Sequence, residues 1–146
     1  MIKRKLKRYA QIINNIDDPQ DRFLWIMDFG KNSRAMDNKH KIKSFEVPGC
    51  QSQTWLVPHF VEDKIYFTAD SAALISKGMV SIIADVYSGA RAQDIKEFDQ
   101  DEFKILKLDT LLTPGRNNGV HSMLKKVKFY SKKNANNTNS NTNSAV

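Results

Sequence analysis

The chain has 146 residues, enough for one domain with a real core but too few for two. No apolar run approaches the roughly 20 residues of a membrane span, and the basic start lacks the apolar stretch of a signal peptide, so we expect a soluble cytoplasmic protein with no membrane partner. Taking five basic residues in 1–8 and five in 125–133 from the 23 lysines and arginines leaves 13 against 16 acidic residues, so the net charge of +7 comes from the two ends. We interpret these ends as solvated helix faces, and an RNA-binding module is the weaker alternative.

Two helices are predicted at the start of the chain. Apolar residues recur at helical spacing from Ile2 to Ile13, with the basic residues on the outer side. Asp18 and Pro19 are typical of an N-cap followed by proline at the first helical position, and this second helix should end by Gly30. Its expected apolar face comprises Phe23, Leu24, Ile26 and Met27.

A β-hairpin is predicted next, after a polar and irregular stretch from 31 to 46. Residues 54–57 and 64–68 are rich in β-branched and aromatic side chains, and a short connection at 61–63 separates them. Pro58 cannot donate to a strand ladder, so the first strand should end there, bulge there or lie at an edge of the sheet.

A long central helix is expected after the hairpin. Asp70 and Ser71 should cap it, and it should continue to Gly89. Gly78 within it is interpreted as a point of close packing against the sheet. The wide apolar stripe of this helix comprises Leu74, Ile75, Gly78, Met79, Ile82, Ile83 and Val86.

The remaining segments are predicted to be helical. Short helices are expected at 92–98 and 101–107, and Thr113 and Pro114 should open the last helix. The expected inner face of the last helix comprises Val120, Met123, Leu124 and Val127. Its expected solvated face comprises Lys125, Lys126 and Lys128.

This order of elements predicts an α+β fold: helices, then a small antiparallel sheet, then helices packed on one face of the sheet. No linker or internal repeat divides the chain, so we expect residues 1–133 to form a single domain. Residues 134–146 are almost all Asn, Thr and Ser, with little to bury, and are expected to be a disordered tail.

Cys50 is the single cysteine of the chain. One thiol can form neither an internal disulfide nor a cysteine-only zinc site, which leaves a buried structural cysteine, an intermolecular cross-link or a reactive thiol. The turn formers Pro48 and Gly49 precede it and three polar residues follow it, so we expect a loop that presents the thiol.

A nucleophilic thiol needs a lowered pKa, which a nearby cation, a helix N-terminus or hydrogen-bond donors can supply. Arg116 is the candidate cation, because an arginine at a helix start opposes the helix dipole and is better placed to serve an anion; a plain surface arginine is the alternative. His59 and His121 are candidate bases that could equally face solvent, and His40 lies in a polar loop. The expected cradle around the thiol comprises Gln51, Ser52 and Gln53 with their backbone amides.

Three motifs together resemble the SufE/CsdE family of sulfur-acceptor proteins. They are residues 49–57 (G-C-Q-S-Q-T-W-L-V), residues 70–73 (D-S-A-A) followed by Lys77 and Gly78, and residues 112–119 (L-T-P-G-R-N-N-G). The resemblance runs from about the first helix into the last and omits only the tail. The order and spacing of these motifs make the combination far more specific than any one of them.

The resemblance implies that Cys50 accepts sulfur as a persulfide. In this family a cysteine desulfurase of the SufS or CsdA type, which uses pyridoxal phosphate (PLP), takes sulfur from L-cysteine; the acceptor then relays it to a SufBCD-like iron–sulfur scaffold. The acceptor is a carrier and not an enzyme, needs no cofactor or metal of its own, and is commonly a homodimer. Because an unprotected persulfide is soon reduced, the loop is expected both to present Cys50 and to hide it.

Carried over by position, Arg116 matches the family's arginine near the cysteine, and Asp70 matches the cap of its central helix. The loop residues that shape the site match Gly49, Gln51, Ser52 and Gln53. The family usually has a second acidic residue where this chain has Ala72, a departure that leaves the cysteine intact and bears on loop dynamics or partner contact.

The main alternative is a stand-alone cysteine hydrolase or transferase. It would use Cys50 as nucleophile and His59, nine residues away, as base. Such a site also needs a partner that orients the histidine, and the sequence offers no recognisable one.

Overall fold

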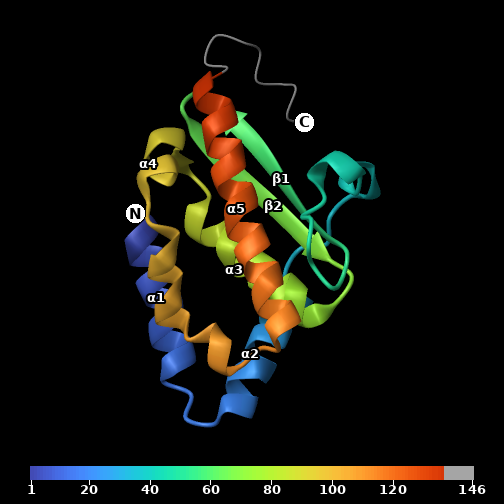
Figure 1. Ribbon diagram of the computed structural model, residues 1–146, viewed down its shortest axis with the longest axis vertical. Coiled ribbons are helices and arrows are strands. Elements are labelled where there is room, and N and C mark those ends of the chain that lie inside the picture. The colour runs from blue at the N-terminus through green and yellow to red at the C-terminus, as the bar shows by residue number, and fades with distance from the viewer. Residues whose placement is uncertain (137–146) are drawn as a thin grey trace.

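The computed structural model describes residues 1–136, which form an α+β domain with a three-stranded antiparallel sheet (Figure 1). This confirms the predicted fold class. The helices and strands are α1 (Ile2–Asn14), α2 (Pro19–Asn32), β1 (Thr54–Val61), β2 (Lys64–Ser71), α3 (Leu74–Tyr87), β3 (Ala90–Arg91), α4 (Ala92–Glu97) and α5 (Pro114–Asn136). Short 3-10 helical turns lie at Asn38–His40, Lys43–Phe45, Gln100–Leu106 and Leu108–Thr110.

The boundary predicted between domain and tail falls inside a helix. α5 continues to Asn136, so the first three residues assigned to the tail are helical. Residues 137–146, the rest of the predicted tail, lie outside the described residues, and their disorder stays a prediction.

The predicted hairpin is present, and both strands are longer than the sequence pattern indicates. β1 and β2 pair in antiparallel register from Thr54 opposite Ser71 to Val61 opposite Lys64, and β3 pairs with the far side of β2. β1 is thus an edge strand, and Pro58 lies within it, which is one of the three outcomes expected for this proline.

The two faces of the hairpin pack against different parts of the chain, as the alternation of side chains along a strand requires. On one face the strands join the main core with α3 and α5, and the hydroxyl of Tyr130 in α5 donates to the carbonyl oxygen of Leu56 at 3.0 Å. The opposite face carries a smaller cluster that comprises Met36, Phe45, Trp55 and Val57. The irregular chain between α2 and β1 therefore covers the side of the sheet that the helices leave open.

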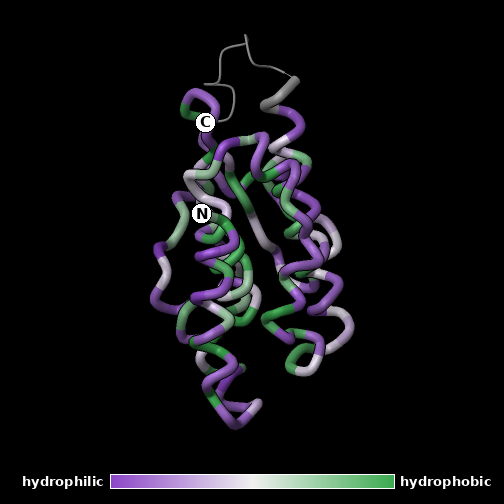
Figure 2. The backbone as a smooth tube through the Cα atoms, turned by 90° about the vertical axis from the view of Figure 1, so that its left-hand side faces the viewer, coloured by the Kyte–Doolittle hydropathy of each residue, from purple (hydrophilic) through white to green (hydrophobic). Residues whose placement is uncertain are grey.

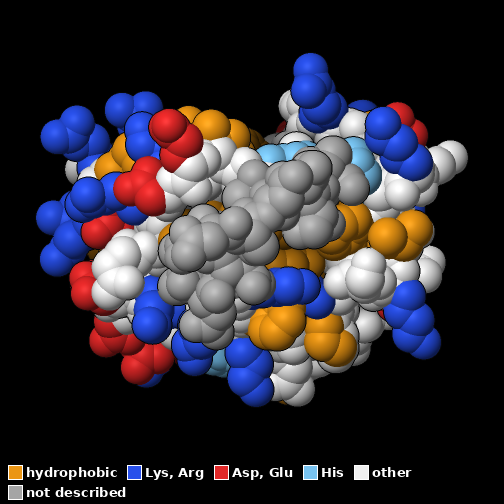
Figure 3. Space-filling view, turned by 90° about the horizontal axis from the view of Figure 1, so that it is seen from above, with side chains coloured by type: hydrophobic (Ala, Val, Ile, Leu, Met, Phe, Trp, Pro, Cys, Tyr) orange, Lys and Arg blue, Asp and Glu red, His pale blue; other side chains and the backbone are white. Residues whose placement is uncertain are grey.

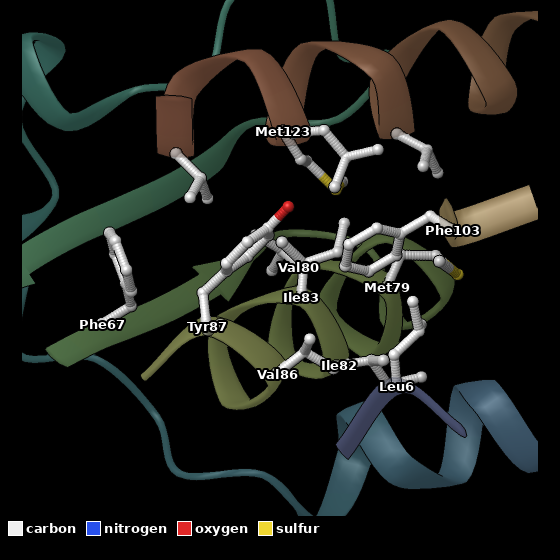
Figure 4. Close-up of a cluster of buried hydrophobic side chains, with 14 of the residues drawn as sticks. Leu6, Phe67, Met79, Val80, Ile82, Ile83, Val86, Tyr87, Phe103 and Met123 are labelled. Carbon is white, nitrogen blue, oxygen red and sulfur yellow. The ribbon is translucent and has the colours of Figure 1, made fainter. Parts of the chain in front are cut away.

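α3 is the central helix of the core. In Figure 4 its labelled side chains lie between Met123 of α5 on one side and Leu6 of α1 on the other. Its residues from Ile75 to Tyr87 are mostly buried. Burial of an apolar stripe of this kind is the main source of stability for a domain of this size.

The predicted close packing at Gly78 is present, but its partner is α2 and not the sheet. A Cβ atom added at Gly78 would lie under 3.0 Å from the backbone oxygen of Ile26. One added at Gly30 would lie under 3.0 Å from the backbone of Gly78 and of Leu74. The two glycines therefore let the backbones of α2 and α3 touch where the helices cross.

The expected cap of the central helix is wrong. Asp70 and Ser71 belong to the end of β2, and α3 begins at Leu74 without a side-chain cap. The helix start is displaced because the strand extends further than its β-branched residues indicate, and the antiparallel register places Asp70 opposite Trp55.

Asp70 instead fastens the chain between α2 and β1 to the sheet. Its buried carboxylate accepts hydrogen bonds from the backbone N–H groups of Met36 at 3.0 Å and Ser71 at 2.8 Å. The ammonium groups of Lys41 and Lys77 lie 3.5 and 3.6 Å from its oxygens. Burial alone would raise the pKa of Asp70, but these hydrogen bonds and cations outweigh it and hold the pKa below its usual value.

Asp70→Asn is therefore expected to lower the free energy of unfolding at neutral pH by about 2–4 kcal/mol, because it breaks a buried ion pair. A lowered carboxyl pKa contributes stability above the ordinary aspartate pKa of about 3.9 and loses that contribution as the pH falls through the folded value. The difference between wild type and variant, measured by urea unfolding, should accordingly shrink as the pH falls below about 4.

Asp94→Asn is the matched control, since Asp94 forms an exposed ion pair with Arg91 at 3.3 Å. Exposed pairs contribute about 0–1 kcal/mol. Equal losses in the two variants would contradict the role assigned to Asp70.

Three predictions about helix faces are wrong. Leu24, expected on the buried face of α2, is 48% exposed, and Leu74, expected in the apolar stripe of the central helix, is 41% exposed because it is the first residue of α3. Lys128, expected on the solvated face of α5, donates through Nζ to the carbonyl oxygens of Ile95 at 2.7 Å, Lys96 at 3.0 Å and Phe98. These carbonyls lie at the end of α4, where a cation is favourable, so Lys128 holds α4 against α5.

No helix among residues 1–136 is long and apolar enough to span a membrane. In Figure 2, hydrophobic and hydrophilic residues alternate along the helical parts of the backbone. Seen from above, Lys and Arg side chains are spread around the visible face and are mixed with acidic ones on one side (Figure 3). Where described residues are visible on this face, their basic side chains form no continuous stripe of the kind that tracks a nucleic-acid backbone.

Candidate functional site

Cys50 lies where three distant segments meet: the loop before β1, the first turns of α3 and the first turns of α5. Gly49 has φ of +81°, a left-handed conformation that glycine adopts without strain, and it turns the chain just before the cysteine. At the other end of the loop, the hydroxyl of Thr54 donates to the carbonyl oxygen of Ser52 at 3.0 Å. The loop is therefore short and held at both ends.

The thiol is half-buried and packs against the core. Cys50 Sγ lies 3.8 Å from the carbonyl oxygen of Gly119, to which it donates a weak hydrogen bond. A Cβ atom added at Gly119 would lie 3.4 Å from Sγ, so the missing side chain keeps space for the sulfur beside α5. In this state the loop shelters Cys50 more than it presents it.

Arg116 is the third residue of α5, and its side chain reaches the cysteine loop. Its Nη1 atom donates to Ser52 Oγ at 3.0 Å and to Ser76 Oγ of α3 at 2.5 Å. Thr113 caps the helix by accepting the backbone N–H of Arg116 at 3.3 Å, which agrees with the predicted start of the last helix. Among residues 1–136 no carboxylate forms an ion pair with this guanidinium.

The electrostatics at Cys50 combine opposing effects. Burial is the largest effect and raises the pKa of the thiol above its ordinary value, while the hydroxyl of Thr54 and the positive charge of Arg116 lower it. The net shift is upward, so the sheltered thiol is protonated at neutral pH. The groups that would favour a thiolate are already in place, and burial is what opposes them.

The glutamines of the loop have different contacts. Gln51 is exposed and its amide lies against Gly115, where an added Cβ atom would be under 3.0 Å from it. Gln53 acts through its backbone: its carbonyl oxygen accepts from Ala72 N and Ser71 Oγ, both at 2.9 Å. The loop is thus tied to the end of β2 and to the first turn of α5.

Asp70, which the sequence places near the site, forms no hydrogen bond or ion pair with Cys50 or Arg116 among the described residues. Its contribution is to order the chain beside the sheet. Its connection to the site runs through the neighbouring Ser71, whose hydroxyl bonds to Gln53.

Of the histidines, His59 lies along β1 away from the cysteine loop. His59 is five residues beyond Thr54 on β1, about 17 Å at the ordinary rise of a strand. Its Nε2 atom lies 3.1 Å from Thr68 Oγ1, and its ring is 6.1 Å from that of His40. Burial and the neighbouring His40 lower the pKa of His59. His121 is exposed.

The surface has one cavity away from the cysteine loop and one groove beside it. The cavity, of about 750 Å³, is lined by His40 and His59 together with residues of α2 and α3. The groove, of about 500 Å³, opens beside the cysteine loop. Its lining comprises Pro48, Gly49, Ser122, Lys125, Lys126 and Phe129. The surface next to Cys50 is therefore open to a second molecule even though the thiol itself is sheltered.

Sequence reasoning missed two side chains of the site, Thr54 and Ser76. Thr54 lies within the predicted first strand, where a β-branched residue needs no further explanation. Ser76 lies within the apolar stripe of α3, and a polar residue buried among apolar ones was the available signal. What it contacts could not be read from the chain, because Arg116 is 40 residues away.

Comparison with known proteins agrees with this picture. A family model described as "SufE: Fe-S metabolism associated domain" matches residues 7–131. An uncharacterised SufE-like protein of Rhizobium meliloti (strain 1021) is 34% identical over 126 residues, 81% of this chain and 90% of that protein. "Cysteine desulfuration protein SufE" of Plasmodium falciparum is 28% identical over 132 residues, 86% of this chain and 53% of that protein.

"SufE-like protein 1, chloroplastic/mitochondrial" of Arabidopsis thaliana is 30% identical over 122 residues, 83% of this chain. The matched part is 33% of the Arabidopsis protein, so this chain corresponds to about a third of it. A hypothetical protein from Thermus thermophilus, solved in solution, has the same fold, with a TM-score of 0.73 at 14% identity over 90% of this chain and 96% of that one. With a family model that matches most of its length, this chain belongs to the SufE family, whose domain is associated with Fe–S metabolism.

Proposed function

We propose that this protein accepts sulfur at Cys50 from the persulfide of a cysteine desulfurase and relays it to iron–sulfur cluster assembly. The observation that carries the proposal is the site itself: a single cysteine on a short tethered loop, beside an arginine whose charge no carboxylate neutralises among the described residues. The family description and the name of the Plasmodium relative support the same chemistry.

The transfer is a thiol exchange. The Cys50 thiolate attacks the outer sulfur of the desulfurase persulfide, the sulfur–sulfur bond of that persulfide breaks, and its electron pair stays on the desulfurase cysteine. That cysteine takes up the proton that Cys50 released, and Cys50 becomes the persulfide. The sulfur is transferred without net oxidation or reduction, so the step needs no cofactor on this chain.

The raised thiol pKa fits a carrier that reacts only with its partner. While Cys50 packs against Gly119 it is protonated and slow to react, which protects it between transfers. Docking of the desulfurase would draw the loop outward and remove the burial that raises the pKa. The positive charge of Arg116 then favours the thiolate, and the return of the loop to its sheltered position would protect the persulfide from reductants.

The partners follow from this chemistry. The desulfurase, of the SufS or CsdA type, would hold the PLP, and a SufBCD-like scaffold would receive the sulfur. The groove beside the loop, with Lys125 and Lys126 in its lining, lies where an approaching partner would meet the protein. A homodimer and a cytoplasmic location remain parts of the proposal.

The test combines the protein with an active cognate desulfurase and L-cysteine and measures intact mass without reductant. We expect a gain of one sulfur atom that a thiol reductant removes. Cys50→Ser should gain none, because an alcohol is not a nucleophile toward a persulfide under these conditions. No gain by the wild type, with a desulfurase shown to release alanine, would refute the proposal.

The hydrolase alternative has no specific observation in its favour. The base that it needs, His59, lies about 17 Å along β1 from Thr54, the first residue of the strand that follows the cysteine loop. His59 also has its own contacts with Thr68 and His40.

A further inference from the structure

Ser76 is a buried polar residue in the apolar stripe of α3. Its exposed fraction is 4%, and its helix neighbours Ile75 and Met79 belong to the main core. Its hydroxyl oxygen accepts a hydrogen bond from Arg116 Nη1 at 2.5 Å. Burying a hydroxyl is costly unless it is hydrogen-bonded, so the side chain of Arg116 makes a serine tolerable here.

Arg116 gains little from its own helix. It lies in the first turn of α5, where the helix dipole disfavours a cation. Both hydrogens of Nη1 are used, one on Ser76 and one on Ser52, while Nε and Nη2 have no hydrogen-bond partner among residues 1–136. The guanidinium is thus held from one side and keeps free donors and an undiminished charge beside Cys50.

The two serines that hold Arg116 are not equivalent. Ser52 belongs to the cysteine loop, so its hydrogen bond is lost whenever the loop moves outward. Ser76 belongs to α3, which packs into the main core, so its hydrogen bond to Arg116 does not involve the loop. A serine hydroxyl also holds the guanidinium without neutralising it, as a carboxylate would.

We propose that Ser76 is a positioning residue that holds the guanidinium of Arg116 beside the cysteine loop, including when the hydrogen bond to Ser52 is lost. A role of Ser76 in sulfur transfer rests on the proposed function. Its effect on the reactivity of the Cys50 thiol is independent of that function. Ser76 acts only through Arg116 and contacts no reacting atom.

The test measures the rate at which iodoacetamide alkylates Cys50 of the isolated protein as a function of pH. In Ser76→Ala the guanidinium loses its fixed anchor, so the alkylation profile should shift to higher pH. The rate at neutral pH should fall roughly threefold to tenfold, since one pKa unit is a tenfold change in thiolate. Ser76→Thr keeps the hydroxyl and should restore most of the rate.

Two comparisons separate positioning from a merely structural effect. Ser131→Ala removes another fully buried serine hydroxyl, which bonds to a backbone carbonyl of α5, and should leave the profile unchanged. In an Arg116→Ala background, Ser76→Ala should have no further effect on the profile. The assignment would be overturned if Ser76→Ala left the alkylation profile unchanged. It would also be overturned if Ser76→Ala shifted the profile as much in the Arg116→Ala background as in the wild type.

The alkylation assay needs no desulfurase, so the two proposals can fail separately. If the profile moves as expected but the wild type gains no sulfur, Ser76 still positions Arg116 and the sulfur-acceptor function is wrong. If sulfur transfer occurs but the profile of Ser76→Ala matches the wild type, the function stands and the role of Ser76 is wrong. Far-UV circular dichroism of each variant confirms that the fold compared is the same.

Discussion

Arg116→Ala is expected to slow the gain of sulfur by Cys50 by roughly ten- to hundredfold. The substitution removes the positive charge that lowers the thiol pKa against the effect of burial. It also removes the hydrogen bond that holds Ser52 of the loop. A cation near a developing thiolate in a partly dry site contributes on the order of 1–3 kcal/mol. The measurement is the initial rate of persulfide formation by intact mass, with desulfurase and L-cysteine in excess.

Arg91→Ala is the matched control for this experiment. Arg91 is an exposed arginine whose ion pair with Asp94 lies on the surface, so its removal should leave the rate unchanged. Arg116→Lys keeps a charge but loses the planar guanidinium whose Nη1 group bonds both hydroxyls, and we expect an intermediate rate. A wild-type rate in Arg116→Ala would show that the arginine near the thiol has no part in the transfer.

Gly78→Ala is expected to destabilise the fold by about 3 kcal/mol or more, because overpacking forces α2 and α3 apart. The added methyl group would meet the backbone oxygen of Ile26 at under 3.0 Å, and a backbone atom in the middle of a helix cannot move aside. The gain in helix propensity, about 1 kcal/mol, offsets only part of this cost. Urea unfolding followed by circular dichroism gives the free energy directly.

Gly115→Ala is the control, because its added Cβ atom would lie as close to a neighbouring atom as the one added at Gly78. Its added Cβ atom would also lie under 3.0 Å from a neighbour, but that neighbour is the amide end of the exposed Gln51 side chain, which can rotate away. We expect a change in the unfolding free energy within about 0.5 kcal/mol. Similar losses at both positions would mean that the α2–α3 crossing is not as tight as the structure places it.

The sequence predicted most of the helices and strands and singled out a candidate thiol, because both depend on local information. Periodicity and turn formers located the helices and the hairpin, and the isolation of a single thiol in a polar turn singled out Cys50. Arg116 was predicted from a local conflict as well, a cation at the positive end of a helix. Its position beside the cysteine loop agrees with that reasoning.

The wrong predictions concern residues whose contacts with distant segments differ from those that their local sequence suggests. Asp70 is a good helix cap by type, but the strand pairing extends through it, and groups from the chain before β1 and from α3 bind its carboxylate. Lys128 has the spacing of a solvated residue, yet the end of α4 lies within its reach. Gly78 was expected to pack closely, and only the tertiary structure identified Gly30 and Ile26 as its neighbours.

For the site, the sequence by itself singled out Cys50 as the candidate thiol and Arg116 as the candidate cation, since both follow from residue type and local context. The tertiary structure alone decided that the thiol is sheltered against Gly119, that burial raises its pKa, and that Ser76 holds Arg116. These depend on distances between segments 40 or 69 residues apart, and packing sets such distances. A chain specifies packing through the whole core and not through any one motif.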